Sequence, residues 1–502
     1  MKKSLLFIAL LVIATTFVRF DGIVSAQKPN ATLATAKNDA LEERIKRVEN
    51  GLLPAVVIKG APPAGTTLTE RLEHYKIPGV SIAVVNDGRI EWARAYGVKD
   101  ATTKEPVTTE TLFQAGSISK PVAALAALKL VEQGKLSLDE DVNAKLVSWK
   151  LPENEFTKDQ KVTLRRLLTH NAGLTVHGFP GYAADAPVPT LVQVLNGEKP
   201  ANTPPIRVDT VPGTIWRYSG GGYTIMQQLL IDVTKKPFPE IMRTLVLEPV
   251  HMTHSTYEQP PPPARAQLAA TAHNGGQAVK GRYHTYPEMA AAGLWTTPTD
   301  LAALIIELQN SLAGKSNRVL SKSMTTQMLS KQFQNWGLGA SVSLLGQTIE
   351  FSHGGSDEGF EAYWVGFSDG RGAAVMTNGD RGSALAMEVL RSIAREYGWP
   401  DLQPKEKVVA TVDPKIYESY SGDYELKVNP TLTVILTVST EGGKLFVQQN
   451  AGAKREWLPA SETEYFSLAS GNTLRFSRDE QGRTNELTIF QDGEKYTGKK
   501  IK

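Results

Sequence analysis

The sequence predicts a mixed α/β (α+β) domain followed by a small all-β domain. Two observations indicate the first domain: β-rich runs occur at both ends of residues 68–402, and long apolar helical stretches lie between them. A third observation indicates the second domain, because after Pro400 the chain changes to short alternating strands separated by glycine turns. We expect the strands at the two ends of the first domain to share one sheet.

Length and composition indicate an ordinary globular protein of more than one domain. A chain of 502 residues is longer than one hydrophobic core usually supports, so two or three folded units are expected. Hydrophobic residues make up 41% and charged residues 21% of the sequence, which disfavours disorder. The formal charge is +3, from 55 basic and 52 acidic residues, so we expect no nucleic-acid partner.

The N-terminus has the pattern of a secretory signal peptide. Lys2 and Lys3 precede the apolar run Leu5–Phe17, and small residues stand at positions 24–26, which predicts a signal peptide over residues 1–26. An uncleaved membrane anchor is the alternative, but the run is shorter than the roughly 20 residues that a bilayer needs. We therefore expect a periplasmic or secreted protein with no stable membrane span after cleavage.

Residues 27–67 are polar and Ala-rich, and they are interpreted as a leader with a short helix around Leu41 to Val48. The chain contains no cysteine, which excludes disulfides, thiolate metal sites and a lipidated N-terminal cysteine.

The domain over residues 68–402 opens with a predicted hairpin, in which Val80–Val85 and Ile90–Tyr96 flank the turn Asn86-Asp87-Gly88. A second hairpin is predicted from Glu361–Phe367 and Gly372–Thr377. Helices are predicted between the two hairpins, over Pro121–Gln133, Leu164–Thr169, Tyr223–Val233 and Asp300–Leu312.

A linker is expected over residues 403–413 and the all-β domain over 414–502. The turns of that domain are placed at Glu441–Gly443 and Asp479–Gly482. Its predicted strands include Thr431–Val438, Lys444–Gln449, Thr473–Ser477 and Glu486–Phe490.

Ser117 and Lys120 are the first candidate catalytic pair. Three residues apart on a helix, they share one face, so the amine can reach the hydroxyl. A serine needs a base to become a nucleophile, and a lysine can be that base if burial lowers its pKa. The following run Pro121–Ala127 has almost no polar face, which predicts a buried helix. Its N-terminus would direct partial positive charge toward Ser117.

Tyr218 lies on an aromatic, glycine-rich bend, Trp216–Tyr223, directly before a predicted helix. A tyrosine there could act as a proton shuttle if a neighbouring ammonium lowers its pKa from about 10. The alternative is a packed tyrosine beside a turn.

His353 lies in the run Phe351–Ser356, which reads as a strand whose glycines allow a ligand to approach closely. The alternative for this histidine is a purely structural role.

These three elements, in this order, resemble the serine β-lactamase and penicillin-binding-protein superfamily, particularly its class C-like esterase and D-aminopeptidase branch. The resemblance covers roughly residues 68–399. Flanking strings similar to the family are Ile77-Pro78-Gly79-Val80, residues 167–174 (LLTHNAGL), Pro212-Gly213 and residues 293–301 (GLWTTPTDL). The resemblance implies a β-lactamase-like antiparallel sheet flanked by helices, with an all-helical region.

The resemblance also implies roles for individual residues. Ser117 matches the acylated serine, Lys120 its partner in proton transfer, and Tyr218 the tyrosine of the second motif. His353 stands where many relatives place the lysine of Lys-Thr-Gly.

The oxyanion hole would be the backbone amides of Ser117 and Ser356. Gly220, Gly354 and Gly355 would contact substrate, and His170 would be structural. No metal and no cofactor are implied.

Two departures from the family pattern leave the substrate open. The second motif usually reads Tyr-x-Asn, whereas this chain has Tyr218-Ser219-Gly220 and lacks the amide that commonly contacts substrate. His353 is also largely neutral at pH 7, which weakens the charge available for a substrate carboxylate. Short esters, D-amino-acid peptides and β-lactams all remain candidate substrates, and the oligomeric state is unknown.

Other readings have less support. A nucleophile elbow needs Gly-x-Ser-x-Gly, but Ala115 stands two residues before Ser117, and the zinc motif His-Glu-x-x-His does not occur. The runner-up is a catalytically weak scaffold with a binding or structural role. The favoured prediction is an exported serine hydrolase that cleaves an ester or amide of a small molecule or peptide.

The C-terminal domain resembles the lipocalin-like barrel appended to some members of the family, with Tyr417 to Tyr424 as its opening. We hypothesise that it covers or restricts the mouth of the active site.

Overall fold

The computed structural model describes residues 31–61, 65–429, 432–450, 452–481, 483–491 and 494–501. The chain divides into two compact units, residues 1–47 and 48–502. The predicted signal peptide, residues 1–26, lies outside the described residues. Of the helices that the described residues form, none is both long and apolar enough to cross a membrane.

The predicted leader contains a longer helix than expected. Helix α1 spans Ala31–Glu49, whereas the sequence predicted a short helix around Leu41 to Val48. The alanines that precede Leu41 have high helix propensity. The prediction gave more weight to the polar character of the segment and so began the helix too late.

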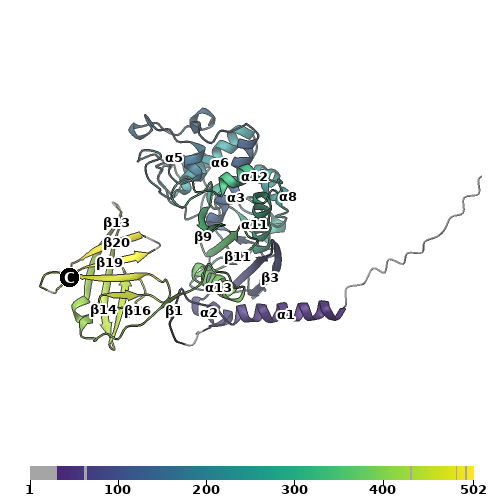
Figure 1. Cartoon of the computed structure of the whole chain (residues 1–502). Coiled ribbons are helices and arrows are strands. Elements are labelled where there is room, and N and C mark those ends of the chain that lie inside the picture. The colour runs from purple at the N-terminus through teal and green to yellow at the C-terminus, as the bar shows by residue number, and fades with distance from the viewer. Residues whose placement is uncertain are drawn as a thin grey trace, which may run out of the picture. The chain divides into compact units, whose positions relative to one another are not determined.

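The first domain is organised around a six-stranded antiparallel sheet with the order β3-β2-β11-β10-β9-β8 (Figure 1). Both predicted hairpins are present, and Asp87 and Gly88 both have positive φ at the first turn, as a tight hairpin requires. Strand β11 pairs with β2 through Met376 and Ser81, so the two ends of the domain share one sheet as predicted. The strands are β2 (Gly79–Asn86), β3 (Arg89–Gly97), β8 (Ser341–Leu345), β9 (Thr348–Asp357), β10 (Phe360–Phe367) and β11 (Gly372–Thr377).

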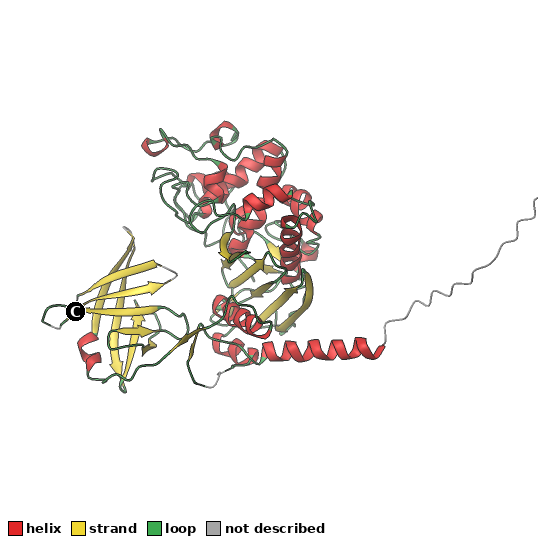
Figure 2. Cartoon of the chain, in the orientation of Figure 1, coloured by secondary structure: helices red, strands yellow, loops and turns green. Residues whose placement is uncertain are grey.

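Helices α11 (Pro298–Leu312) and α13 (Gly382–Glu396) cover opposite faces of this sheet (Figure 2). On the α11 face, a Cβ at Gly366 or Gly372 would lie 2.9 Å from Ile305 Cγ2, so glycine allows the helix to pack closely. On the α13 face, a Cβ at Gly382 would lie 1.8 Å from Thr377 Oγ1. A sheet buried on both sides explains why β2 is apolar along almost its whole length.

The remaining helices form the all-helical region and its connections, except the last of them, Ile416–Tyr420, which packs on the barrel. All four predicted helices are present, as α3, α4, α6 and α11, and the Pro121–Ala127 run of α3 is buried as expected. The helices other than α1, α11 and α13 are α2 (Leu68–Tyr75), η1 (Gly116–Ile118), α3 (Ser119–Glu132), η2 (Val142–Ala144), η3 (Glu155–Thr157), α4 (Leu164–Leu168), α5 (Leu191–Asn196), α6 (Gly220–Thr234), α7 (Phe238–Met242), η4 (Arg243–Leu247), α8 (Glu248–Val250), α9 (Pro263–Ala266), α10 (Met289–Ala292), α12 (Lys322–Met328) and α14 (Ile416–Tyr420).

Among the described residues, six short strands lie outside the large sheet and the barrel. Strand β1 (Val56–Ile58) pairs in parallel with β12 (Lys405–Lys407). The others form the antiparallel pairs β4 (Phe113–Gln114) with β7 (Trp295–Thr296) and β5 (His273–Asn274) with β6 (Gln277–Ala278).

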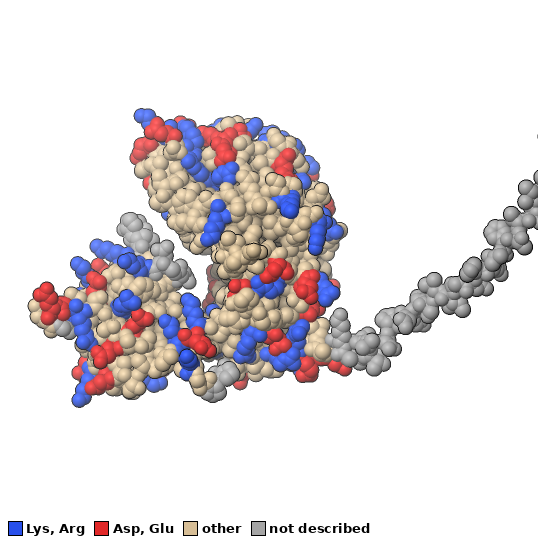
Figure 3. All heavy atoms as spheres, in the orientation of Figure 1, with Lys and Arg blue, Asp and Glu red and all other residues tan. Residues whose placement is uncertain are grey.

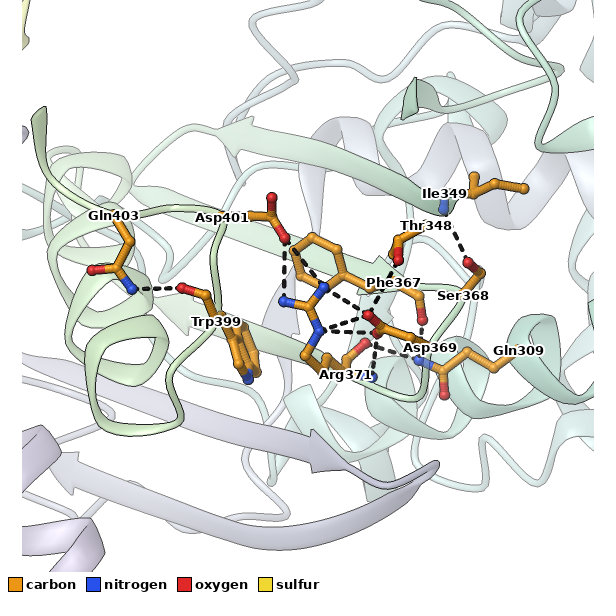
Figure 4. A network of polar contacts seen from close by, with 10 residues as sticks. All are labelled: Gln309, Thr348, Ile349, Phe367, Ser368, Asp369, Arg371, Trp399, Asp401 and Gln403. Atoms are coloured by element: carbon orange, nitrogen blue, oxygen red, sulfur yellow. Dashed lines mark hydrogen bonds and ion pairs between the residues drawn. The ribbon is translucent and has the colours of Figure 1, made fainter. Parts of the chain in front are cut away.

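A polar network fixes the turn between β10 and β11 (Figure 4). The Arg371 guanidinium donates to Asp369 at 2.7 and 2.9 Å and to Asp401 at 3.2 Å. From α11, Gln309 donates to the carbonyl oxygens of Phe367 and Arg371, both at 2.8 Å. This turn is therefore tied to the helix that covers the sheet.

The second predicted domain is a closed eight-stranded barrel in the order β13 to β20. All four strands predicted there are present, and Gly442 and Gly443 have positive φ at the predicted turn, whereas Gly482 of the other turn lies outside the described residues. The strands are β13 (Gly422–Asn429), β14 (Leu432–Glu441), β15 (Lys444–Gln449), β16 (Arg455–Pro459), β17 (Glu464–Phe466), β18 (Thr473–Arg478), β19 (Thr484–Gln491) and β20 (Glu494–Lys500).

The interior of the barrel is filled by aliphatic and aromatic side chains, among them Leu436, Leu445 and Leu474. Tyr420 and Phe476 stack there with ring centroids 4.0 Å apart.

Charged side chains of both signs are interspersed on the face shown in Figure 3, in keeping with the small net charge of +3.

Candidate active site

Ser117 lies on η1, directly before the buried helix α3. Gly116 makes this position possible because its φ is +49° and a Cβ there would lie 2.4 Å from the backbone nitrogen of Ser356. Similarly, a Cβ at Gly355 would lie 1.9 Å from the carbonyl oxygen of Ala115. The backbone around Ser117 is therefore in close contact with strand β9, and two glycines are what permit it.

Lys120 is held against Ser117 in a dry environment. Its side chain is almost fully buried, and its Nζ donates to Ser117 Oγ at 2.9 Å and to the Ala291 carbonyl oxygen at 2.8 Å. Burial lowers the pKa of Lys120 to about 7, with the charge of Asp357 acting in the opposite direction. A large fraction of the amine is therefore neutral near pH 7, as a base for Ser117 must be.

Tyr218 lies beside this pair, with its ring centroid 4.9 Å from Lys120 Nζ. The sequence analysis made a proton-shuttle role for Tyr218 conditional on a neighbouring ammonium that lowers its pKa, and this condition is not met. Burial raises the pKa of Tyr218, and the opposing effect of a hydrogen bond with Ser117 is smaller. Its hydroxyl is therefore protonated at neutral pH. It can relay a proton between other groups, but it is not present as a phenolate that could act as the base.

His170, expected to be structural, packs on Tyr218 with ring centroids 4.2 Å apart. Its Nδ1 accepts a hydrogen bond from the Ser219 amide at 3.1 Å. This buried histidine orders the bend that carries Tyr218.

His353 lies on β9 and faces the same group of side chains. Burial lowers the pKa of His353 to about 3, and the charge of Lys120 acts in the same direction. Its Nδ1 lies 2.5 Å from the Gly354 carbonyl oxygen, which places the proton of the neutral ring on Nδ1. The ring is therefore uncharged at neutral pH, as expected, whereas a lysine at this position would be charged.

Ser117, Tyr218 and His353 line one cavity of about 500 Å³. Its wall includes several aromatic side chains, with Trp336 against His353 at a ring-centroid distance of 5.5 Å. No lysine, arginine, aspartate or glutamate is among its lining residues, which are Ser117, His177, Trp216, Tyr218, Trp336, Ser341, Ser352, His353, Gly354, Gly355, Ser356, Tyr363 and Ser383. The side chains that line the cavity therefore carry no charge at neutral pH.

A somewhat larger cavity, about 600 Å³, lies near α7, η4 and α8 and contains none of the predicted catalytic residues. Among the residues that the structure describes, no group of three His, Asp or Glu side chains is placed to hold a metal ion.

The glycines predicted to contact substrate divide into two sets. Gly354 and Gly355 line the cavity, whereas Gly220 does not. A Cβ at Gly220 would lie 2.9 Å from Phe179 Cε2, so the missing side chain serves packing at the start of α6.

The sequence model of the Beta-lactamase family matches residues 65–396. The chain belongs to the beta-lactamase family. Residues 406–500 match a second model, described as a domain of unknown function (DUF3471).

Penicillin-binding protein 4* of Bacillus subtilis (strain 168) is 22% identical over 461 residues, which cover 85% of the chain and 96% of that protein. Protein flp of Staphylococcus aureus (strain MRSA252) is 27% identical over 197 residues, or 39% of the chain and 38% of flp. The beta-lactamase-family chain thus spans about two fifths of the length of the first curated relatives it matches.

The solved structure of the octameric penicillin-binding protein homologue from Pyrococcus abyssi has the same fold, with a TM-score of 0.58 and 21% identity. The match covers 86% of the chain and 98% of that structure. At 21% identity, this likeness shows the fold that the two chains share.

Several residues near the nucleophile were not predicted from the sequence. His177, Trp336 and Tyr363 line the cavity, but none stands in a recognised motif. Asp357 could have been noticed, because it follows His353 by four residues on the same strand and an acidic residue there needs an explanation.

Proposed function

We propose that this protein is an exported serine hydrolase that cleaves uncharged esters through a covalent acyl-enzyme on Ser117. The observation that carries the proposal is the 2.9 Å contact between Ser117 Oγ and the buried amine of Lys120. A serine beside a lysine that is partly neutral at pH 7 has the base that nucleophilic attack requires.

The reaction proceeds in two steps. Ser117 Oγ attacks the substrate carbonyl while its proton passes to Lys120, directly or through the Tyr218 hydroxyl, and the leaving alcohol departs with a proton. Water then attacks the acyl-enzyme, which releases the acid and restores Ser117. The amides of Ser117 and Ser356 are the proposed donors to the oxyanion, supported by the close approach of their backbones.

The uncharged cavity supports esters over the other two substrate classes. A β-lactam or a peptide with a free carboxylate lacks a cationic partner among the cavity residues, since His353 is neutral. A D-aminopeptidase substrate carries an ammonium and lacks an anionic partner there. Burying either charge unpaired costs free energy, whereas a neutral ester meets no such cost.

A panel of three substrates tests this proposal: a neutral short-chain p-nitrophenyl ester, D-alanyl p-nitroanilide and an anionic β-lactam. We expect the ester to have the highest kcat/KM and Ser117→Ala to abolish its turnover. Ser383→Ala, which removes another serine of the same cavity, is the matched control and should retain activity. Equal ester turnover in Ser117→Ala would overturn the proposal and favour the scaffold alternative.

Export remains part of this proposal and is supported by the sequence of residues 1–26. Fractionation of cells expressing the full chain tests it, with retention of the uncleaved protein in the cytoplasm as the contrary result.

A further inference from the structure

Three aromatic side chains of the active-site cavity lie around a fourth, Trp336. The ring centroid of Trp336 is 5.5 Å from that of Trp216 and 5.5 Å from that of His353. It is 6.1 Å from that of Tyr218. All four residues line the cavity that contains Ser117. The mechanism above uses Tyr218, but it gives no role to either tryptophan.

The main chain holds Trp336 in a tight turn. Its amide donates to the Phe333 carbonyl oxygen at 3.0 Å, and its own carbonyl oxygen accepts from the amides of Gln332 and Phe333 at 2.8 and 3.2 Å. A side chain on such a fixed backbone is largely ordered before a ligand binds, which lowers the entropic cost of binding. Because these bonds do not involve the indole, a different side chain at position 336 can keep the turn.

The two tryptophans present carbon atoms to the cavity. The Nε1 atom of each indole is buried and forms no hydrogen bond with the described residues, whereas both residues are partly exposed. The part of each indole that lines the cavity is therefore ring carbon. Such a surface binds apolar groups, and its flat rings favour a second aromatic ring over an aliphatic ring of similar size.

The path of the proton places the leaving alcohol near these rings. As the acyl C–O bond breaks, the alkoxy oxygen takes the proton that Ser117 lost, from Lys120 directly or through the Tyr218 hydroxyl. Lys120 Nζ lies 4.9 Å from the centroid of the Tyr218 ring. That centroid is 6.4 Å from the ring centroid of Trp216 and 6.1 Å from that of Trp336. An alcohol that takes this proton therefore has the tryptophans as neighbours.

We propose that the substrate of this site is a neutral ester of an arylalkyl alcohol, whose aromatic ring packs on Trp216 and Trp336. This inference deepens the proposed function and rests on it, because it concerns the alcohol that leaves when Ser117 is acylated. Trp336 is then a specificity-determining residue: it contacts the leaving group and takes no part in the transfer of the proton.

Benzyl acetate and cyclohexylmethyl acetate test this proposal, because they share the acyl group and differ in the aromaticity of the alcohol. The quantity to compare is the ratio of their kcat/KM values, which reports on the steps up to loss of the alcohol. In Trp336→Leu the ratio of benzyl to cyclohexylmethyl ester should be about fivefold lower than in the wild type. Comparing the ratio between proteins cancels the difference in intrinsic reactivity of the two esters.

Trp336→Phe is the matched control. Phenylalanine and leucine both shorten the side chain, but only phenylalanine keeps an aromatic ring, so the ratio in Trp336→Phe should stay close to the wild-type value. A ratio that falls equally in both variants would show that size alone matters, and it would overturn the proposal.

A second pair of esters tests the position of the ring. Methyl phenylacetate and methyl cyclohexylacetate differ in the acyl group, so their ratio of kcat/KM should be the same in the wild type and in Trp336→Leu. A change in this ratio as large as that of the first pair would contradict the placement of the ring on the alcohol side.

Thermal melting checks that each variant is folded. If Trp336→Leu does not fold, the inhibition constants of benzyl alcohol and cyclohexylmethanol with the wild type replace it. Benzyl alcohol should bind about fivefold more tightly. Equal binding of the two alcohols would overturn the proposal.

The outcomes separate this inference from the proposed function. If the wild type turns over both acetates through Ser117, but their ratio is the same in all three proteins, the preference for an aryl alcohol is overturned and the acyl-enzyme stands. If wild-type turnover does not depend on Ser117, the proposed function itself fails.

Discussion

The interiors of the two folded domains differ in how their buried polar groups are hydrogen-bonded. In the barrel, three buried tyrosines donate to main-chain carbonyls: Tyr420 and Tyr465 to Glu462, at 2.8 and 3.0 Å, and Tyr424 to Tyr420 at 2.8 Å. No charged residue is among the buried residues of the described part of the barrel. The beta-lactamase-family domain instead buries Lys120, Glu288 and Asp357, and the four carboxyl oxygens form no hydrogen bond of ordinary geometry with the described residues.

This difference in buried polar groups indicates that the barrel interior serves stability, whereas the buried ionisable groups of the other domain serve chemistry. Hydrogen-bonded tyrosine hydroxyls and an apolar interior stabilise the barrel, although Thr484 Oγ1 is buried without a partner among the described residues. A buried lysine and buried carboxyls without ordinary hydrogen bonds cost the beta-lactamase-family domain free energy, and perturbed ionisable groups of this kind cluster at catalytic sites. Substitutions at the two places should therefore act on different quantities: the proposed activity in the beta-lactamase-family domain and stability in the barrel.

The largest effect is expected for Lys120→Met. Loss of the base should lower ester kcat/KM by about a thousandfold, within the usual range for a general base. Because the buried charge is replaced by an apolar side chain of similar size, the melting temperature should stay the same or rise. Lys129→Met, on the same helix but paired with Glu132 near the surface, is the control and should keep full activity. If Lys120→Met were as active as the control, the assignment of Lys120 as the base would be contradicted.

Tyr218→Phe should have the next largest effect, a fall in kcat of about a hundredfold, because the hydroxyl that passes the proton is lost. Tyr363→Phe removes another hydroxyl from the same cavity, one that donates to Ser352 at 3.3 Å, and should change kcat little. Steady-state kinetics on the neutral ester measures both, and similar values for the two variants would rule out a special role for Tyr218.

The pH dependence of the wild type follows from Lys120, whose pKa is about 7. Only the neutral amine accepts the Ser117 proton, so kcat/KM should reach a plateau above pH 7 and fall about tenfold per pH unit well below it. An activity that is constant from pH 5 to pH 8 would contradict this assignment.

The smallest effect is expected in the barrel. Tyr424→Phe removes the donor to the Tyr420 carbonyl oxygen and should lower the free energy of unfolding by about 1 kcal/mol. Ester turnover should be unchanged, since Tyr424 has no contact with the reacting groups. Chemical denaturation and the ester assay, run on the same preparation, check both statements.

The sequence predicted the local elements well because their signals are local. Asn86-Asp87-Gly88 favours a tight hairpin, and the apolar run after Lys120 favours a buried helix; both are present. The shared sheet was also predicted correctly, from strands at the two ends of the domain.

Burial and long-range contact limited the prediction of the site. The pKa of Tyr218 rises because of its surroundings, which neighbouring residues in the chain do not reveal. Glu288 and Asp357 lie far apart in the sequence and meet only in the fold. The aromatic wall formed by Trp336 likewise depends on how the chain packs around His353.

Peptide-mapping mass spectrometry after labelling with a fluorophosphonate tests the central assignment most directly. The reagent should add once, to the peptide that contains Ser117, and Ser117→Ala should remain unlabelled while Ser383→Ala labels normally. An adduct on another residue, or a folded wild type that no acylating or phosphonylating reagent modifies, would contradict the assignment of Ser117 as the nucleophile.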